Sequence, residues 1–276
     1  MRQRAIILAV VVVVAVAGAC QAWEYNWKTE VGASYMTRYI WRGFDVYGRN
    51  HSAVQPFVNF SCPDGGWSGG VWMSRANGAG FENYEELDYW VAYDNGWWAD
   101  TSYATNYQFG YMYYNYPDGP ASHSCHDRDL DAHEMWATLS WPNMCSQGIV
   151  PSYTAIRMWQ AESGLRADGC PWSNFRGSGG WIHVLGLAYD QPVPGWFPSN
   201  PDQTLHWTAQ TVYNDHMGGD DVDHDWSHAV FGVSTDVPTV AGGTLTPGIW
   251  YQSSWDDSVN TSDEWWAGVT GKWPVN

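Results

Sequence analysis

The sequence predicts an all-β protein, an up-and-down antiparallel β-barrel of about twelve strands that follows a cleaved signal peptide. Three observations lead to this fold class. Segments in which apolar and polar residues alternate with period 2 recur along the chain, and no stretch has a convincing helical period. The connections between these segments are alternately long and short. Finally, the 276 residues include 21 Trp and 17 Tyr, an excess of aromatic side chains with a polar edge.

The first 22 residues form the predicted signal peptide. Arg2 and Arg4 precede an apolar run, and the small residues of "ACQA" follow it. This run is too short for a membrane helix, and no later stretch of about 18 residues is apolar throughout. A lipoprotein anchor at Cys20 is the alternative, because "AGAC" loosely resembles a lipobox. Residues 23–276 are expected to form a single β-barrel domain.

The period-2 segments define the strands, most of them about 9–11 residues long, which is the length that crosses a bilayer at a tilt of about 45°. In "ELDYWVAY", for example, Leu87 and Tyr89 point to the face opposite that of Glu86 and Asp88. We expect strands at 29–42, 53–61, 66–75, 84–94, 101–115, 132–141, 150–159, 181–190, 203–213, 227–236, 244–254 and 263–273.

The connections after the first strand are alternately long and short. "DVYGRNHS" is followed by "CPDGG", and "RANGAGFEN" is followed by "DNGWWAD". Outer-membrane barrels have long extracellular loops and short periplasmic turns, so this order favours a membrane barrel over a soluble meander. The segment "DQPVPGWFPSNPD" breaks the series, because it is long where a short turn is expected.

The aromatic content and the charge narrow the class of function. Trp and Tyr suit surfaces with an apolar side and a wet side, such as the girdles of a membrane barrel. A soluble sandwich or a carbohydrate-binding surface is the alternative. The formal net charge is −17, and removing Arg2 and Arg4 makes it −19. Such a chain is excluded from binding nucleic acid through an electrostatic footprint.

The first predicted strand contains "YMTRYIWRGFDVYG". Tyr39 and Trp41 share one parity, and Arg38 and Arg42 share the other. In a membrane barrel, we expect the aromatic set to face lipid and the arginines to face the lumen. On this interpretation, aspartate at Tyr39 blocks membrane assembly, whereas Arg42→Ala mainly disturbs the lumen.

A luminal charge network is predicted from the same parity argument. Small barrels fill their interiors with side chains, and buried charges persist when they are paired. The expected members are Arg38, Arg42, Glu86 and Asp88. A structural salt-bridge lattice without a role in transport is the alternative interpretation of these residues.

Four cysteines remain after cleavage, and four cysteines allow three pairings. Cys125 and Cys170 both fall in predicted outer loops on consecutive hairpins, so we expect a disulfide between them. Cys62 and Cys145 both fall in predicted inner turns, four strands apart, and are the second expected pair.

One acidic, histidine-rich loop is a candidate metal site, and "HSCHDRDLDAHE" has a similar composition. Carboxylates suit Ca²⁺, and imidazoles suit Zn²⁺ or Cu²⁺. Neither segment has EF-hand or structural-zinc spacing, so a solvated acidic loop without a cofactor is the simpler expectation. The candidate ligands are His216, Asp220, Asp221, Asp223, His224, Asp225 and His228.

No enzyme signature stands out. The chain lacks Gly-x-Ser-x-Gly, a phosphate loop and His-Glu-x-x-His. Asp, His and Ser residues are abundant in the predicted loops, but they lack a characteristic spacing. We therefore expect no catalytic residues, with hydrolysis at the barrel rim as the remaining alternative.

Nearly the whole mature chain resembles a known family, and the resemblance is most specific in the N-terminal third. "SYMTRYIWRGFDVYGRNHSAVQPFVNFS", "WSGGVWMS" and "ENYEELDYWVAYD" are similar to the TorF-type porins of bacteria, a family of outer-membrane barrels. The resemblance implies an outer-membrane barrel but no particular substrate. The ending "GKWPVN" departs from the family's usual terminal aromatic residue. The matching positions are Tyr39, Trp41, Arg42, Gly43, Gln55 and Pro56.

Together these features predict a narrow porin-like channel for small solutes or cations in the outer membrane of a Gram-negative-type bacterium. The acidic charge favours cations. The expected partners are outer-membrane lipid and small solutes, and self-association into a homo-oligomer stays open. The alternative is an exported, extracellular or cell-surface β protein that acts as an assembly subunit or a binding module.

Overall fold

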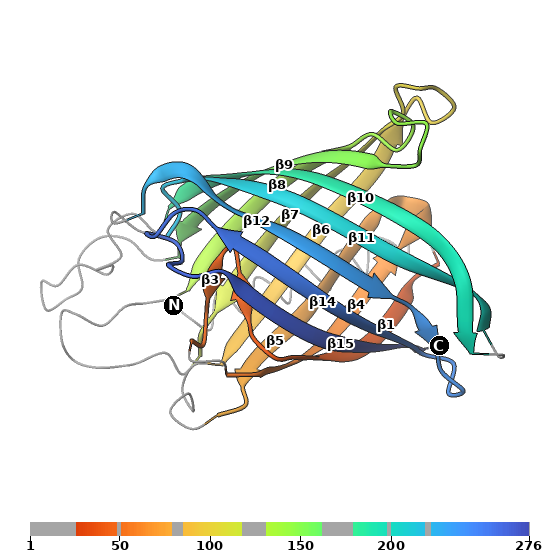
Figure 1. The fold of residues 1–276 in the computed structure, drawn as a ribbon, viewed down its shortest axis with the longest axis horizontal. Helices are drawn as coiled ribbons and strands as arrows, with labels where there is room; N and C mark the ends of the chain where they lie inside the picture. The colour runs from red at the N-terminus through yellow and green to blue at the C-terminus, as the bar shows by residue number, and fades with distance from the viewer. Residues whose placement is uncertain are drawn as a thin grey trace, which may run out of the picture.

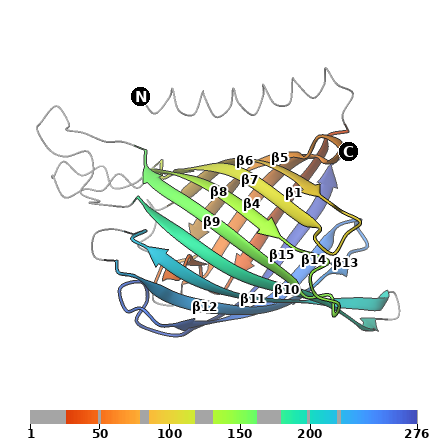
Figure 2. The same cartoon turned by 90° about the horizontal axis from the view of Figure 1, so that it is seen from above.

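The computed structural model describes residues 26–48, 51–78, 85–117, 131–161, 179–197, 200–218 and 222–275. Most of these residues form strands of one antiparallel sheet that closes on itself (Figures 1 and 2). Its long strands are β1 (Lys28–Met36), β4 (Ala53–Cys62), β5 (Trp67–Ala76), β6 (Glu86–Trp97), β7 (Thr105–Asn115), β8 (Ala132–Ser140), β9 (Val150–Gln160), β10 (Gly180–Phe197), β11 (Asn200–Asp215), β12 (His224–Thr235), β14 (Thr244–Ser254) and β15 (Glu264–Val275).

Sequential pairing and two closing contacts make this sheet a twelve-stranded barrel. The first strand, β1, pairs with β4 on one side and with the last strand, β15, on the other. β12 pairs directly with β14, while the short β13 (Val237–Pro238) adds to the end of β14. The predicted up-and-down barrel is therefore confirmed. Within the described residues, no helix has the length and apolarity needed to cross a membrane.

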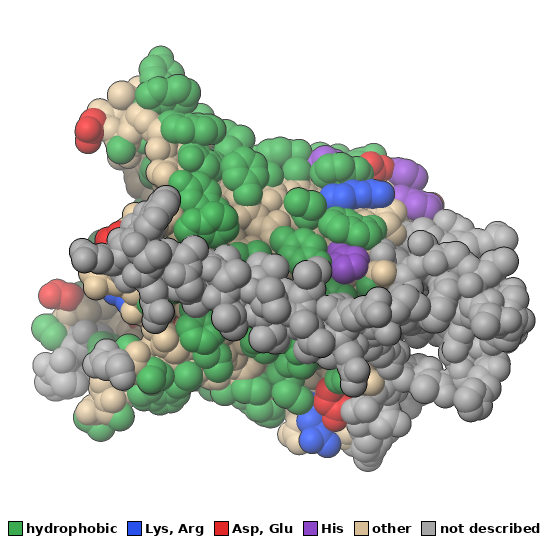
Figure 3. Space-filling model, turned by 180° about the vertical axis from the view of Figure 1, so that it is seen from behind, with side chains coloured by type: hydrophobic (Ala, Val, Ile, Leu, Met, Phe, Trp, Pro, Cys, Tyr) green, Lys and Arg blue, Asp and Glu red, His purple; other side chains and the backbone are tan. Residues whose placement is uncertain are grey.

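The strands place apolar side chains outside and polar side chains inside. On β6, Glu86 and Asp88 are buried within the barrel. Leu185 and Leu187 of β10 and Phe231 of β12 are each about half exposed on the outer wall. Figure 3 shows hydrophobic side chains over the middle of the wall, with charged and histidine side chains toward its ends. A soluble sandwich buries such residues, so this distribution supports a membrane barrel.

The wall gives a direct test of membrane insertion. Replacing Phe231, which is 51% exposed on the outer face of β12, by Arg is expected to destabilise the inserted barrel by about 2–4 kcal/mol. Ser234→Arg, on the opposite parity of the same strand, is the matched control and leaves insertion unchanged. Each variant is folded into lipid vesicles, and electrophoresis of the unheated samples then measures the fraction of folded protein. Equal loss in both variants would contradict the assigned faces.

The predicted strand ranges match the observed ones to within four residues at both ends for ten of the twelve strands. One exception is the anomalous segment "DQPVPGWFPSNPD". It is a continuation of β10 and β11, which remain paired from Asp190↔His206 to Phe197↔Asn200. The long connection is therefore mostly an extension of two paired strands, which agrees with the alternation of long and short connections.

The other exception is the first strand, where the predicted range 29–42 is wrong. β1 ends at Met36, and the chain then turns into the barrel to form β2 (Ile40–Trp41) and β3 (Phe44–Asp45). In Figure 1, β3 lies within the ring of strands. Tyr39 and Trp41 therefore face the lumen rather than lipid, and Tyr39 is only 8% exposed. The prediction that aspartate at Tyr39 blocks assembly through the lipid face is wrong, because Tyr39 does not lie on that face.

A two-residue turn reverses the chain between β2 and β3. Trp41 pairs with Phe44, so Arg42 and Gly43 are the central residues of the turn. Both have positive φ, 52° at Arg42 and 97° at Gly43. Positive φ at both positions is the geometry of a type I′ hairpin turn, which matches the twist of the flanking strands. We call residues 37–48 the inward hairpin.

The predicted Cys62–Cys145 disulfide is wrong, because both residues are free thiols. Cys62 ends β4, and Cys145 lies in the turn between β8 and β9. Three strands separate β4 from β8, and neighbouring strands lie about 4.8 Å apart, so the two turns are roughly 19 Å apart along the sheet. A disulfide needs Cα atoms within about 7 Å. Cys125, Cys170 and the predicted signal peptide lie outside the described residues.

Candidate functional site in the barrel lumen

The tip of the inward hairpin is held by an ion pair with the barrel wall. Arg42 Nη2 lies 2.7 Å from Glu134 Oε1, and Tyr114 donates its hydroxyl to the other oxygen of Glu134 at 2.8 Å. Glu134 lies on β8 and Tyr114 on β7, and both are buried. The hydrogen bond from the Arg42 guanidinium to the Glu134 carboxylate is charge-assisted, so it is strong and directional. Together with the hydrogen bond from Tyr114, it determines where the tip of the hairpin lies.

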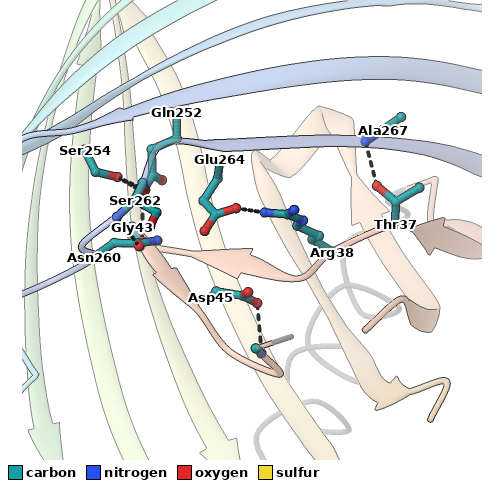
Figure 4. A network of polar contacts seen from close by, with 11 residues as sticks. Thr37, Arg38, Gly43, Asp45, Gln252, Ser254, Asn260, Ser262, Glu264 and Ala267 are labelled. Atoms are coloured by element: carbon teal, nitrogen blue, oxygen red, sulfur yellow. Dashed lines mark hydrogen bonds and ion pairs between the residues drawn. The ribbon is translucent and has the colours of Figure 1, made fainter. Parts of the chain in front are cut away.

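A second contact holds the backbone of the tip. The Gly43 carbonyl accepts hydrogen bonds from Gln252 Nε2 at 2.9 Å and from Asn260 Nδ2 at 3.0 Å (Figure 4). A Cβ atom at Gly43 would lie 2.7 Å from Nδ1 of His228 on β12. The close approach and the positive φ both require glycine here.

The stem of the hairpin is held on the opposite wall. Arg38 forms an ion pair with Glu264 of β15 (Figure 4). Thr37 N donates to the Ala267 carbonyl at 2.8 Å, and Ala267 N donates to Thr37 Oγ1 at 2.9 Å. β8 and β15 are six strands apart in either direction around the twelve-stranded barrel. Because Arg38 pairs with β15 and Arg42 with β8, the hairpin crosses the lumen from wall to wall.

Aromatic packing closes the root of the hairpin. Tyr39 contacts Tyr47 with ring centroids 5.5 Å apart, and it contacts Trp72 of β5 at 5.7 Å. Tyr47 donates its hydroxyl to Ser74 Oγ at 2.9 Å, and burial raises the pKa of Tyr47 to about 12. Glu86 of β6 accepts hydrogen bonds from the hydroxyls of Tyr39 and Tyr116. Neutral tyrosines thus surround the buried carboxylate of Glu86.

Two cavities adjoin this constriction. One of about 440 Å³ lies between the hairpin and the wall, and it is lined by Tyr39, Trp41, Arg42, Asp88, His228 and Gln252 among others. A larger cavity of about 790 Å³ lies at the opposite end of the barrel, next to the turn at 63–66. Its lining includes the polar residues Asp94, Asn106 and Gln108. The lumen thus has a wide polar part and a narrow, aromatic and charged part.

The predicted luminal residues all lie at this narrow part, but their partners differ from those expected. Arg38 and Arg42 belong to the inward hairpin rather than to a wall strand, and they pair with Glu264 and Glu134. Glu86 is held by tyrosine hydroxyls. Asp88 lines the smaller cavity.

Sequence reasoning missed Glu134, Glu264 and Gln252. Each is a polar residue on the lumen-facing side of a wall strand, and each is less than 10% exposed. Glu134 in "AHEMWATLS" carries the same signal that identified Glu86, an acidic residue alternating with apolar ones. Their contact with residues 38–43 carries no sequence signal, because it depends on how the first loop enters the barrel.

The candidate metal ligands are dispersed. His216 and His224 stack with ring centroids 5.0 Å apart, and His224 contacts the Asp215 carboxylate. His228 is separate, because it is buried in the lumen wall with Nδ1 2.9 Å from Ser227 Oγ. Among the described residues, no three His, Cys, Asp or Glu side chains are grouped as metal ligands.

The remaining members of that set are at the rim or beyond the described chain. Asp223 N donates to Ser258 Oγ at 3.0 Å, and the Asp225 carboxylate accepts from the backbone N–H of Trp226. Asp220 and Asp221 lie outside the described residues, as does most of "HSCHDRDLDAHE". Metal binding by these loops stays a prediction.

Solved structures of porins are similar to this chain. The NanC porin has 11% sequence identity and a TM-score of 0.51, and the match covers 90% of this chain and 100% of that one. The KdgM porin in complex with disordered oligogalacturonate has 6% identity and a TM-score of 0.51, with coverage of 90% and 99%. No protein-family model and no curated protein matches the sequence. At these identities the likeness concerns the fold, and this chain has the barrel fold of these porins.

Proposed function

We propose that this chain is an outer-membrane channel for small solutes whose constriction is the inward hairpin. The observation that carries the proposal is the hairpin's position, crossing the lumen of a closed barrel between Glu264 and Glu134. Water and solute that enter the lumen would meet the hairpin and its two ion pairs, whose pairing offsets the cost of burying the charges. The proposal includes no enzymatic activity.

The outer wall supports the location in the membrane. Aromatic side chains are exposed at both ends of the barrel, with Trp97 and Trp98 at the inner turns and Trp181 and Trp226 near the opposite rim. Aliphatic and aromatic residues such as Leu187 cover the wall between them. Two aromatic girdles around an apolar band are characteristic of outer-membrane barrels. The resemblance of the N-terminal third to TorF-type porins supports the same assignment.

The charges at the constriction favour cations. The basic groups Arg38 and Arg42 are outnumbered by four buried carboxylates, listed here with their strands: Glu86 and Asp88 on β6, Glu134 on β8 and Glu264 on β15. The whole chain is acidic as well, with a formal charge of −17. Each of these groups that is ionised raises the local concentration of cations in the narrow passage and repels anions.

Planar-bilayer recording with a KCl gradient tests the function. We expect discrete conductance steps and a reversal potential on the side that indicates K⁺ preference over Cl⁻. Asp88→Asn is expected to move the reversal potential toward zero. Asp94→Asn, on the same strand in the wide polar cavity, is the matched control with a smaller shift. Absence of steps would contradict the channel and favour a non-conducting surface protein, and anion preference would contradict the role of the carboxylates.

A further inference from the structure

The smaller luminal cavity is lined by aromatic rings and a few polar groups, as small-molecule binding sites are. Its volume of about 440 Å³ falls within the range of small-molecule sites. Aromatic rings make up much of its wall, contributed by the inward hairpin, β5, β6, β7 and β15. These rings are Tyr39, Trp41, Trp72, Trp90, Tyr114 and Trp266.

Three polar atoms in this lining have no hydrogen-bond partner among the described residues. Two are acceptors, Asp88 Oδ1 and Gln252 Oε1, and one is a donor, Arg42 Nε. Asp88 is 3% exposed and Gln252 is 0% exposed, so neither is open to bulk solvent. More than nine in ten buried polar groups in native structures have a partner, and leaving one without is unfavourable. Both orphaned acceptors therefore indicate a ligand with N–H or O–H donors.

The charge around the cavity selects among such ligands. Glu134 is neutralised by Arg42, and Glu86 accepts hydrogen bonds from tyrosine hydroxyls, while one carboxyl oxygen of Asp88 has no partner among the described residues. A neutral polyol would satisfy hydrogen bonds but supplies no charge to hold Asp88 in its ionised form, which burial beside Glu86 disfavours. A bare divalent metal would meet few oxygen ligands, because most of the lining residues are aromatic or aliphatic. An organic cation satisfies both conditions, since its charge faces the carboxylate and its remaining surface faces the rings.

We propose that this cavity binds a small primary ammonium compound. The ammonium N–H groups donate to the Asp88 carboxylate and the aromatic faces of Trp72 and Trp90 surround the charge, while an oxygen on the same molecule accepts from Arg42 Nε. Gln252 Oε1 accepts a further donor of the ligand. The inference deepens the proposed channel function, because it names the class of solute recognised at the constriction.

Calorimetric titration of the folded full chain in detergent micelles tests the site. Ethanolamine carries both the ammonium and the oxygen acceptor, ethylene glycol lacks the charge, and tetramethylammonium lacks the N–H donors. We expect saturable binding of ethanolamine, at least tenfold weaker binding of tetramethylammonium, and no saturable binding of ethylene glycol. Asp88→Asn is expected to weaken ethanolamine binding by about tenfold or more, the effect of losing a charge-assisted hydrogen bond.

Two further variants keep the test specific. Asp94→Asn changes the same residue type on the same strand outside the cavity, and it is expected to leave ethanolamine binding unchanged. Trp90→Leu removes one ring of the cavity and is expected to weaken binding several-fold. The heat-dependent mobility of each variant in electrophoresis verifies folding. Equal losses in the two Asn variants, or equal binding of the three compounds, would overturn the proposal.

Bilayer recording separates this inference from the channel function. If ethanolamine blocks the K⁺ current of the wild type but not that of Asp88→Asn, the result supports both the ammonium site and the channel function. Conductance without binding or block overturns the ammonium site and leaves the channel standing. Binding in micelles without any conductance supports the site and overturns its role in transport.

Discussion

Replacing residues 40–45 by two glycines is expected to raise the single-channel conductance several-fold, because this change removes the segment that crosses the lumen. Two glycines can connect Tyr39 to Val46 without strain, because these residues are already adjacent: Val46 N donates to the Tyr39 carbonyl at 3.0 Å. The twelve wall strands keep their pairing, so the barrel is expected to insert, with the loss of stability that follows from removing the Arg42 partner of Glu134. Conductance in planar bilayers and electrophoretic mobility of unheated samples are the two measurements.

A matched control for this excision is available in the same chain. Residues 98–103 form an exposed inner turn of the same length, and their replacement by two glycines is expected to leave the conductance within the range of the wild type. Unchanged conductance after removal of 40–45 would show that the hairpin is not the narrowest part of the passage. The narrowest part of the passage would then lie between side chains of the wall strands.

Arg42→Ala is expected to destabilise the barrel by about 3 kcal/mol, because it leaves the Glu134 carboxylate buried with only the Tyr114 hydroxyl as partner. This is the low end of the range for buried pairs, since 26% of the Arg42 side chain is exposed. Adding Glu134→Gln removes the uncompensated charge and is expected to recover much of the loss. Urea unfolding from lipid vesicles of both single variants and the double variant gives the coupling energy, expected at about 1–3 kcal/mol.

The pair Arg75–Glu85 is the control for Arg42–Glu134. Its atoms are 3.5 Å apart and the Arg75 side chain is 59% exposed, so solvent screens the interaction. Arg75→Ala is expected to cost less than about 1 kcal/mol. Similar effects for Arg42→Ala and Arg75→Ala would mean that the tip contact is a surface-like pair that does not hold the hairpin.

The fold could be predicted from the sequence because a membrane barrel imposes a local rule on every strand. Lipid outside and polar groups inside require period-2 alternation, which "ELDYWVAY" shows and the structure confirms for Glu86 and Asp88. The alternating loop lengths follow from the same topology. Even the segment at 190–202 obeys the rule once its residues are assigned to β10 and β11.

The inward hairpin could not be predicted by the same rule. Residues 37–45 keep a period-2 pattern, so they resemble a continuation of β1 toward the membrane surface. The local signal for reversal was the Arg42–Gly43 pair, because glycine is suited to the positive φ of a two-residue turn. That signal indicates a turn but not the side of the wall to which the turned chain goes.

The sequence by itself thus determined the barrel, its approximate strand number and, where apolar and polar residues alternate as in "ELDYWVAY", the face on which a wall residue lies, because these depend on residues close together in the chain. Only the tertiary structure decided the constriction. The partners of Arg38 and Arg42 lie 226 and 92 positions away in the chain, and barrel closure brings their strands to opposite walls. The aromatic cavity beside the hairpin exists for the same reason, since its rings come from strands that meet only around a closed lumen.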